Sequence, residues 1–202
     1  MLDKSKFIKQ TESSVSDYFE KNIDELSLLR ALANYDLYLE KFNSFVEYLN
    51  DWFSLQNSKL YKDLKDNYKY VIYLAETDLS ELQKQVYLSK SLPKEDLKQI
   101  KELASTAKLV YSNISKLDSF IKLKAEKIYP NLVSILGPIL TVRFISQLGS
   151  LKRLAEVPSS TVQLIGAEKA LFRHLKYGKS GPKYGFLYLH PIMSGLDNNK
   201  KG

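Results

Sequence analysis

The stretch LKQIKELASTAKLVYSNISKLDSFI, residues 97–121, decides the fold. Its apolar positions follow one another at steps of three or four residues: Leu97, Ile100, Leu103, Ala107, Val110, Ile114, Leu117 and Ile121. The mean step is close to the ~3.5 residues of a coiled-coil seam. Because a helix with such a stripe buries it against another helix, the chain is predicted to be mainly α-helical.

Helix-breaking residues are almost missing from the first two-thirds of the chain. All eight glycines lie at Gly137 or later, and residues 1–129 hold only one of the six prolines. A second apolar stripe at helical spacing runs over residues 23–53, and a further helical pattern covers residues 60–86. Residues 22–128 are therefore predicted to form long helices, whereas the polar residues 1–21 are typical of a leader or a short helix.

The segment Ser91-Leu92-Pro93 separates the last two helical patterns. Leu92 precedes a proline, which disfavours the helical conformation there, and Pro93 suits the first turn of a new helix. We expect a long antiparallel helical hairpin, or coiled coil, with its tip near residues 90–94. A compact helical bundle is the alternative that the same pattern fits.

Turn-forming residues become frequent after Tyr129, so residues 129–195 are predicted to form a small, mostly helical globular domain followed by a polar tail at 196–202. We expect short apolar helices up to about Val157, then a helix over residues 162–176 and a mobile basic loop. The residues 186–191 are predicted to be extended.

The net charge of +7 is unevenly distributed. Residues 1–100 hold 14 basic and 17 acidic side chains, whereas residues 101–202 hold 16 basic and 6 acidic ones. Concentrated positive charge favours a polyanionic or acidic partner for the second half of the chain. A solvated, lysine-rich surface is the alternative.

One helical face in the second half suits RNA chemically. Lys169, Arg173 and Lys176 are spaced four and three residues apart, which places them on the same side of a helix. The loop that follows carries Tyr177 and Tyr184, whose rings can stack on unpaired bases while the cations contact phosphates. An ordinary surface loop has a similar composition.

Catalysis and metal binding find little support in the sequence. There is no cysteine, and the two histidines, His174 and His190, are too few for a histidine-rich metal site. Gly178-Lys179-Ser180 resembles the end of a phosphate-binding loop, but the required earlier glycine is Arg173. We expect no enzyme, no cofactor and no metal. No apolar run reaches the ~18–20 residues of a membrane span, and we expect no signal peptide.

The segment 129–193 resembles the Nop domain, which occurs in the core proteins of box C/D ribonucleoproteins and in a spliceosomal pre-mRNA-processing factor. The resemblance extends over about residues 22–193 and is greatest to the archaeal box C/D member. It rests on Pro130-Asn131-Leu132, Gly137-Pro138, Ser150-Leu151, Pro158-Ser159-Ser160-Thr161-Val162-Gln163, Gly166-Ala167-Glu168-Lys169-Ala170-Leu171-Phe172 and Pro182-Lys183-Tyr184-Gly185, and on Asp51-Trp52-Phe53-Ser54-Leu55, which is similar to the family's Trp-Tyr-x-Leu-His element.

The resemblance implies a scaffold that binds kink-turn guide RNA together with a kink-turn-binding, ribosomal-protein-like subunit. It also implies self-association through the coiled coil, giving a homodimer. In this family an N-terminal domain recruits the fibrillarin methyltransferase, which carries out 2′-O-methylation of RNA. That domain has no counterpart in these 202 residues, so fibrillarin is expected as a partner only where the parent protein contains it.

The resemblance also assigns residues to the three interactions. RNA binding is expected at Gln163, Lys169, Arg173, Lys176, Lys179, Lys183 and Tyr184. Binding of the partner protein is expected at Gly166, Ala167, Glu168 and Ala170. Self-association is expected at Leu97, Ile100, Ala107, Val110, Ile114 and Leu117.

Two alternatives to a box C/D scaffold remain. One is a structural helical protein that oligomerises through its hairpin, and the other is a spliceosomal-type Nop protein in pre-mRNA processing. The expected location is the cytoplasm of an archaeal cell, or the nucleolus or nucleus if the source is eukaryotic.

Overall fold

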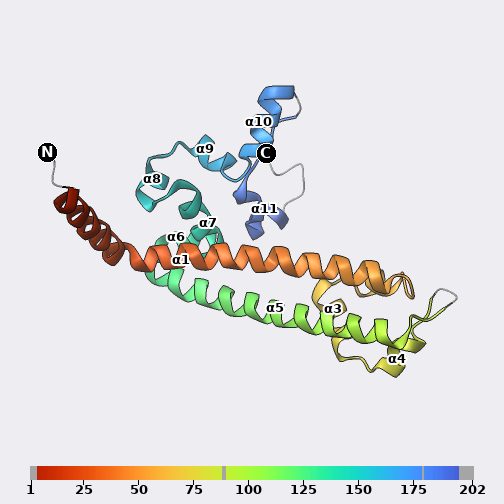
Figure 1. Cartoon of the computed structure of the whole chain (residues 1–202). Helices are drawn as coiled ribbons and strands as arrows, with labels where there is room; N and C mark the ends of the chain where they lie inside the picture. The colour runs from red at the N-terminus through yellow and green to blue at the C-terminus, as the bar shows by residue number, and fades with distance from the viewer. Residues whose placement is uncertain (1–3, 88–89, 179, 196–202) are drawn as a thin grey trace. The chain divides into compact units, whose positions relative to one another are not determined.

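The computed structural model describes residues 4–87, 90–178 and 180–195. Every secondary-structure element within these ranges is helical, so the predicted all-α fold is confirmed (Figure 1). The elements are α1 (Lys4–Phe53), α2 (Leu60–Leu64), α3 (Asn67–Glu76), α4 (Leu79–Lys84), α5 (Lys94–Ile128), α6 (Pro130–Leu136), α7 (Pro138–Leu148), α8 (Leu151–Glu156), α9 (Ser159–Leu164), α10 (Glu168–Tyr177), the 3₁₀ helix η1 (Phe186–Leu189) and α11 (Pro191–Gly195).

The chain divides into two compact units. Unit 1 consists of Met1–Leu32 and Phe120–Gly202, and unit 2 is Ala33–Ser119. The predicted border at residues 128–129 coincides with the end of α5. Unit 1, however, also takes in the last turns of α5 and the first part of α1, so the two long helices contribute to both units.

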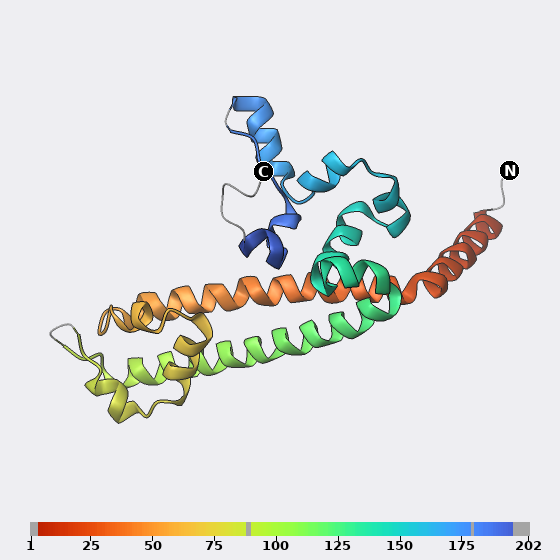
Figure 2. The ribbon, with the colours of Figure 1, turned by 180° about the vertical axis from the view of Figure 1, so that it is seen from behind.

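Unit 2 is built on α1 and α5, which run side by side in opposite directions in both views (Figures 1 and 2). Its core joins Phe42, Val46, Leu49 and Phe53 of α1 to Leu97, Ile100, Ala104 and Ala107 of α5, with Tyr70, Val71 and Leu74 of α3 packed against them. The predicted antiparallel pair of long helices is therefore present, and apolar side chains at helical spacing form its interface.

The predicted tip of the hairpin is wrong in one respect. The partner of α5 is α1, which ends at Phe53, so residues 54–93 form the connection instead of a tight turn at 90–94. The single helix expected over residues 60–86 is three short helices. Lys65 ends α2 in the left-handed conformation with a φ of 53°, and Asp66 then starts α3 by accepting a hydrogen bond of 2.7 Å from the Lys69 amide.

The apolar seam of α5 is used within one chain. Leu97, Ile100, Ala107 and Ile114 are buried in the core of unit 2, Val110 packs against that core and Leu117 is half-buried. The assignment of Leu97, Ile100, Ala107 and Ile114 to self-association is therefore corrected, because the chain's own helices cover their side chains. Self-association at Val110 and Leu117 stays a prediction. Periodicity indicates that a stripe is covered, but it does not identify the covering helix.

A buried glutamine holds the connecting segments of unit 2 together. The side-chain nitrogen of Gln56 donates to the carbonyls of Leu82 and Gln85, and its side-chain oxygen accepts from the amide of Leu92 at 2.9 Å and from the hydroxyl of Ser91 at 3.2 Å. These bonds satisfy an amide that has no access to water, as a buried polar group requires.

The first helix begins earlier than the apolar pattern predicts. Residues 4–21, expected as a leader or a short helix, continue directly into α1. The side chains of residues 11–21 are all exposed, so this part of the helix forms without burying a face. A composition free of glycine and proline permits this continuation.

The core of unit 1 includes the apolar side of α7, where Leu140, Val142, Phe144 and Ile145 are buried. Within the described residues, no helix on its own is long and apolar enough to cross a membrane; α6 and α7, bent by 113° at Gly137, satisfy those criteria only when taken together.

The expectation of an extended segment at residues 186–191 is wrong. Residues Phe186–Leu189 form η1, and Pro191 starts α11. The Phe186 ring packs edge-on against Phe144, with ring centroids 6.0 Å apart. The amide of Tyr188 donates to the carbonyl of Gly185, which closes the 3₁₀ turn. Tertiary packing thus selects a turn where the apolar run over residues 186–189 suggested an extended segment.

Candidate RNA and partner interface

Helix α10 follows a glycine, Gly166, that no other residue can replace without strain. Gly166 has a φ of 88°, in the left-handed region that favours glycine. A side chain there would also overlap the ring of Phe186. The Gly166 amide donates to the Glu168 carboxylate at 2.8 Å, which closes the turn into α10. Of the residues predicted to bind a partner protein, Gly166 is exposed and Ala167, Glu168 and Ala170 are half-buried, so they hold the helix start in place.

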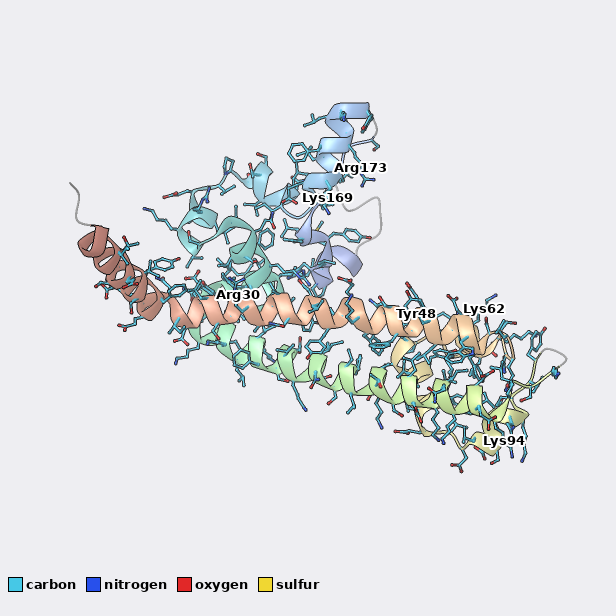
Figure 3. The ribbon with its side chains drawn as sticks, viewed as in Figure 1. Arg30, Tyr48, Lys62, Lys94, Lys169 and Arg173 are labelled. Carbon is cyan, nitrogen blue, oxygen red and sulfur yellow. The ribbon has the colours of Figure 1, made fainter. Side chains whose placement is uncertain are left out.

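The basic face of α10 is present as predicted. Lys169, Arg173 and Lys176 are exposed, and Figure 3 labels Lys169 and Arg173 on the same helix. The Arg173 Nε donates to the carbonyl of Lys169 over 3.4 Å, within the helix itself. These cations extend from a ten-residue helix whose length keeps them within about two turns of one another.

The sequence analysis did not predict the exposed apolar side chains beside the basic face. Phe172 is 67% exposed and Leu175 is 70% exposed, and α10 buries none of its own residues. At about 100° per residue Phe172 lies next to Lys176 on the helical wheel. That angle was available from the sequence, but an apolar residue on an amphipathic helix is normally expected in the core.

The loop before η1 is tied to α9 by three hydrogen bonds. The Gln163 side-chain nitrogen donates to the carbonyl of Lys183 at 2.8 Å, the Gly185 amide donates to the carbonyl of Gln163 at 2.8 Å, and the Phe186 amide donates to the carbonyl of Ile165 at 2.7 Å. A side chain at Gly185 would overlap the Ile165 carbonyl oxygen. Gln163, predicted to bind RNA, therefore positions the loop.

The other predicted RNA-binding residues of the loop differ in accessibility. Lys183 is exposed and Tyr184 is half-buried, while Lys179 lies outside the described residues. On the α10 side, a Cβ at Gly181 would approach the His174 ring to 3.2 Å, so the loop packs closely against the helix. The structure thus brings Lys169, Arg173, Lys176 and Lys183 to one small part of unit 1, held by glycines and by Gln163.

No metal centre accompanies this surface in the part of the chain that the structure describes: no group of three or more His, Asp or Glu side chains gathers there. The surface instead offers exposed ammonium and guanidinium groups beside an exposed phenyl ring and an isobutyl group. Such a set can bind phosphates and an apolar protein surface.

The chain matches the model of the Nop family, described as a snoRNA binding domain, fibrillarin, over residues 36–202. It therefore belongs to the Nop family, and the resemblance found in the sequence is confirmed. The basic helix and its glycine-held loop lie inside the matched region.

Relatives extend over most of this chain. Nucleolar protein 58 of Schizosaccharomyces pombe is 30% identical over 193 aligned positions, and the alignment covers 86% of this chain and 38% of that protein. Nucleolar protein 58 of Candida albicans is 29% identical, and the alignment covers 87% of this chain and 38% of that protein. Nucleolar protein 56 of S. pombe is 27% identical, and the alignment covers 91% of this chain and 42% of that protein. The chain thus spans about two-fifths of their length. All three are fungal, so the closer likeness to an archaeal member stays a prediction.

Proposed function

We propose that this chain is a non-catalytic, RNA-binding scaffold of a box C/D-type guide ribonucleoprotein. Helix α10 and the loop up to Gly185 bind kink-turn RNA together with its kink-turn-binding subunit. One observation carries the proposal: α10 exposes a basic face and, directly beside it, two large apolar side chains, and buries none of its own residues. Membership of the Nop family supports it.

The two chemistries of α10 favour a composite ligand. Lys169, Arg173 and Lys176 are suited to phosphates, which attract cations without regard to sequence. Phe172 and Leu175 gain nothing from phosphates, because apolar area is stabilised by removal from water against another apolar surface. RNA and a protein bound side by side cover both faces, whereas either ligand alone leaves one face uncovered.

The structural contacts refine the expected roles. Gln163, Gly166, Glu168 and Gly185 act as positioning residues, because their hydrogen bonds and close backbone contacts fix the helix start and the loop. In this proposal Lys183 and Tyr184 contribute contacts to the end of the RNA stem. Phe172 and Leu175 join the partner-binding set.

The wider assembly is part of the same proposal. The relatives are named as nucleolar proteins, which favours a nucleolar location over the archaeal cytoplasm. We place the chain in a particle that supports 2′-O-methylation, with fibrillarin as a partner through residues of the parent protein. Pairing of two copies is retained, and it would use exposed residues in place of the buried seam of α5.

The test is a mobility-shift titration of kink-turn RNA with and without its kink-turn-binding protein. We expect binding to be much tighter with both components present. Lys169→Ala or Arg173→Ala should weaken the complex by about 1–3 kcal/mol, as for charged groups in a desolvated contact. Lys122→Ala, which removes an exposed cation of α5, is the matched control and should leave the affinity unchanged.

Phe172→Ser separates the two halves of the proposal. It should weaken the complex with RNA and protein together while leaving weak binding to RNA alone unaltered. Equally weak binding with and without the partner protein would contradict composite recognition. Failure to bind RNA at any salt concentration would favour the structural helical protein instead.

A further inference from the structure

The connecting end of unit 2 carries its own positive charge. Residues 54–65 and 84–98, here called the tip, hold seven lysines and three acidic residues, whereas the rest of unit 2 holds five lysines and ten acidic residues. The tip lysines are Lys59, Lys62, Lys65, Lys84, Lys90, Lys94 and Lys98. Figure 3 labels Lys62 and Lys94 at the end of unit 2 where α1 stops and α5 starts.

The tip lysines are exposed, and none of these seven described side chains forms an ion pair. Elsewhere in unit 2, Lys41 pairs with Glu40, Lys108 pairs with Glu76 at 2.6 Å, and Lys101 donates to the carbonyl of Thr77. Like charges that lack an ionic partner at one end of a unit attract an anionic ligand. The charge of the tip is thus available for binding, unlike much of the charge on the remainder of the unit.

Hydrogen bonds join separate described segments of the tip, which also carries an accessible aromatic ring. Gln56 joins the segment after α1 to the segments at Gln85 and Leu92 by side-chain hydrogen bonds. The Gln56 carbonyl accepts from the Tyr87 amide at 3.0 Å. The Lys59 ammonium lies 4.0 Å from the centroid of the Tyr87 ring, which is 52% exposed. Proteins that bind single-stranded nucleic acids combine an accessible aromatic ring, on which a base stacks, with cations beside it.

We propose that the tip of unit 2 is a second RNA-binding surface, independent of α10, for a single-stranded segment. The lysines contact its phosphates and Tyr87 stacks on an unpaired base. RNA fits this surface better than a protein, because lysine is depleted at protein–protein interfaces, whereas it binds phosphates as a flexible point charge.

The experiment measures fluorescence anisotropy of a labelled 20-nucleotide single-stranded RNA without a kink-turn, titrated with the full chain at several NaCl concentrations. The tip variant is Lys62→Gln, Lys90→Gln, Lys94→Gln. It should bind about tenfold more weakly at about 0.1 M salt, and the slope of log K against log salt should fall by about 2. The matched control is Lys41→Gln, Lys69→Gln, Lys116→Gln, which removes three charges from the rest of unit 2 and should change affinity less than about twofold.

Tyr87→Leu tests the stacking contact. It should weaken binding of the single strand about fivefold and leave binding of a 20-base-pair duplex unchanged, because paired bases cannot stack on the ring. Circular dichroism of each variant checks that the helices are retained.

The outcomes separate this proposal from the one for α10. A tip variant that binds the single strand with the affinity and salt slope of the control overturns the tip proposal, whatever Lys169→Ala does to the kink-turn complex. Polyglutamate is titrated in the same way, as an acidic polypeptide. If the tip variant no longer binds polyglutamate but binds the single-stranded RNA as the control does, the tip serves an acidic polypeptide and the tip proposal is overturned. Weaker binding of the single strand by the tip variant than by the matched control, with a smaller salt slope, supports it, whether or not Lys169→Ala also weakens that binding.

Discussion

Unit 2 and helix α10 follow the same helical periodicity but differ in what covers their apolar side chains. In unit 2 the stripe of α5 is buried against α1 and α3 of the same chain. In α10 the side chains of Phe172 and Leu175 remain in water, and no residue of the helix is buried. An apolar face therefore serves stability where the chain covers it, and is available for binding where the chain does not.

The two regions should also differ in stability. Burial of apolar area contributes about 25 cal/mol per Å², so the core of unit 2 has a large source of stabilisation that α10 lacks. The connection around α10 depends on a few hydrogen bonds and on glycines that let two backbone segments meet. We therefore expect the α10 region to open locally before unit 2 unfolds.

The largest effect is expected from Gly185→Ala, which lies in the less stable region around α10. The new methyl group overlaps the Ile165 carbonyl, so the backbone must move and the bonds from Gly185 to Gln163 and from Phe186 to Ile165 are lost. The local cost should be about 3 kcal/mol. Hydrogen exchange should speed up across residues 163–186 and stay unchanged in unit 2. Gly195→Ala, which meets open space, is the control; equal exchange in both variants would refute the packing argument.

Gln56→Leu tests whether unit 2 depends on its buried amide. The substitution removes four hydrogen bonds and leaves the Leu82 carbonyl and the Leu92 amide without a side-chain partner. We expect the free energy of unfolding to fall by about 2–3 kcal/mol. Urea denaturation followed by circular dichroism measures it, with the exposed Gln99→Ala as the control. A change below about 0.5 kcal/mol would mean that water replaces the lost bonds.

Tyr70→Phe should change the stability at neutral pH least of the three substitutions. Above pH 10 it should change how stability depends on pH. Burial, and then the neighbouring Tyr61, raises the pKa of Tyr70 above its usual value near 10. The folded state therefore favours the neutral phenol, and the resulting stability is fully present below pH 10 and is lost as the pH rises above 10.

The loss of the long 3.4 Å bond from Tyr70 to the Leu49 carbonyl should cost about 0.5–1 kcal/mol at pH 7. Above pH 10 the variant should lose stability less steeply than the parent, as measured by melting temperature against pH. Tyr48→Phe, at a ring 68% exposed, should follow the parent curve. If the melting temperature falls equally steeply with pH in all three proteins, burial of Tyr70 does not raise its pKa.

Local signals in the sequence were sufficient for much of this fold. The absence of glycine before residue 137 and the steps of three and four along α5 predict long helices, because side-chain spacing follows directly from helix geometry. The basic face of α10 was predictable for the same reason. The break between α2 and α3 also had a local signal in Asp66, whose carboxylate caps α3, but the apolar pattern on either side concealed it.

Roles that depend on contacts distant in sequence could not be predicted. Gln163 and Lys183 are twenty residues apart, and Gln56 and Leu92 are thirty-six apart. Nothing in the spacing of either pair indicates that their groups meet. The contact of Gln163 with the loop and the burial of Leu97 in the chain's own core were missed for this reason, since the sequence identifies a polar or apolar group without its partner.

The helical class, the concentration of positive charge and the family could all be predicted from the residues, because periodicity, charge and short motifs are local properties of the chain. Three features became visible only in the folded chain: other helices of the same chain cover the seam of α5, Gly166 and Gly185 are sites of close approach, and Phe172 stays in water. The physical reason is that burial depends on which segments meet in space, and residue spacing along one helix carries no information about the segment opposite.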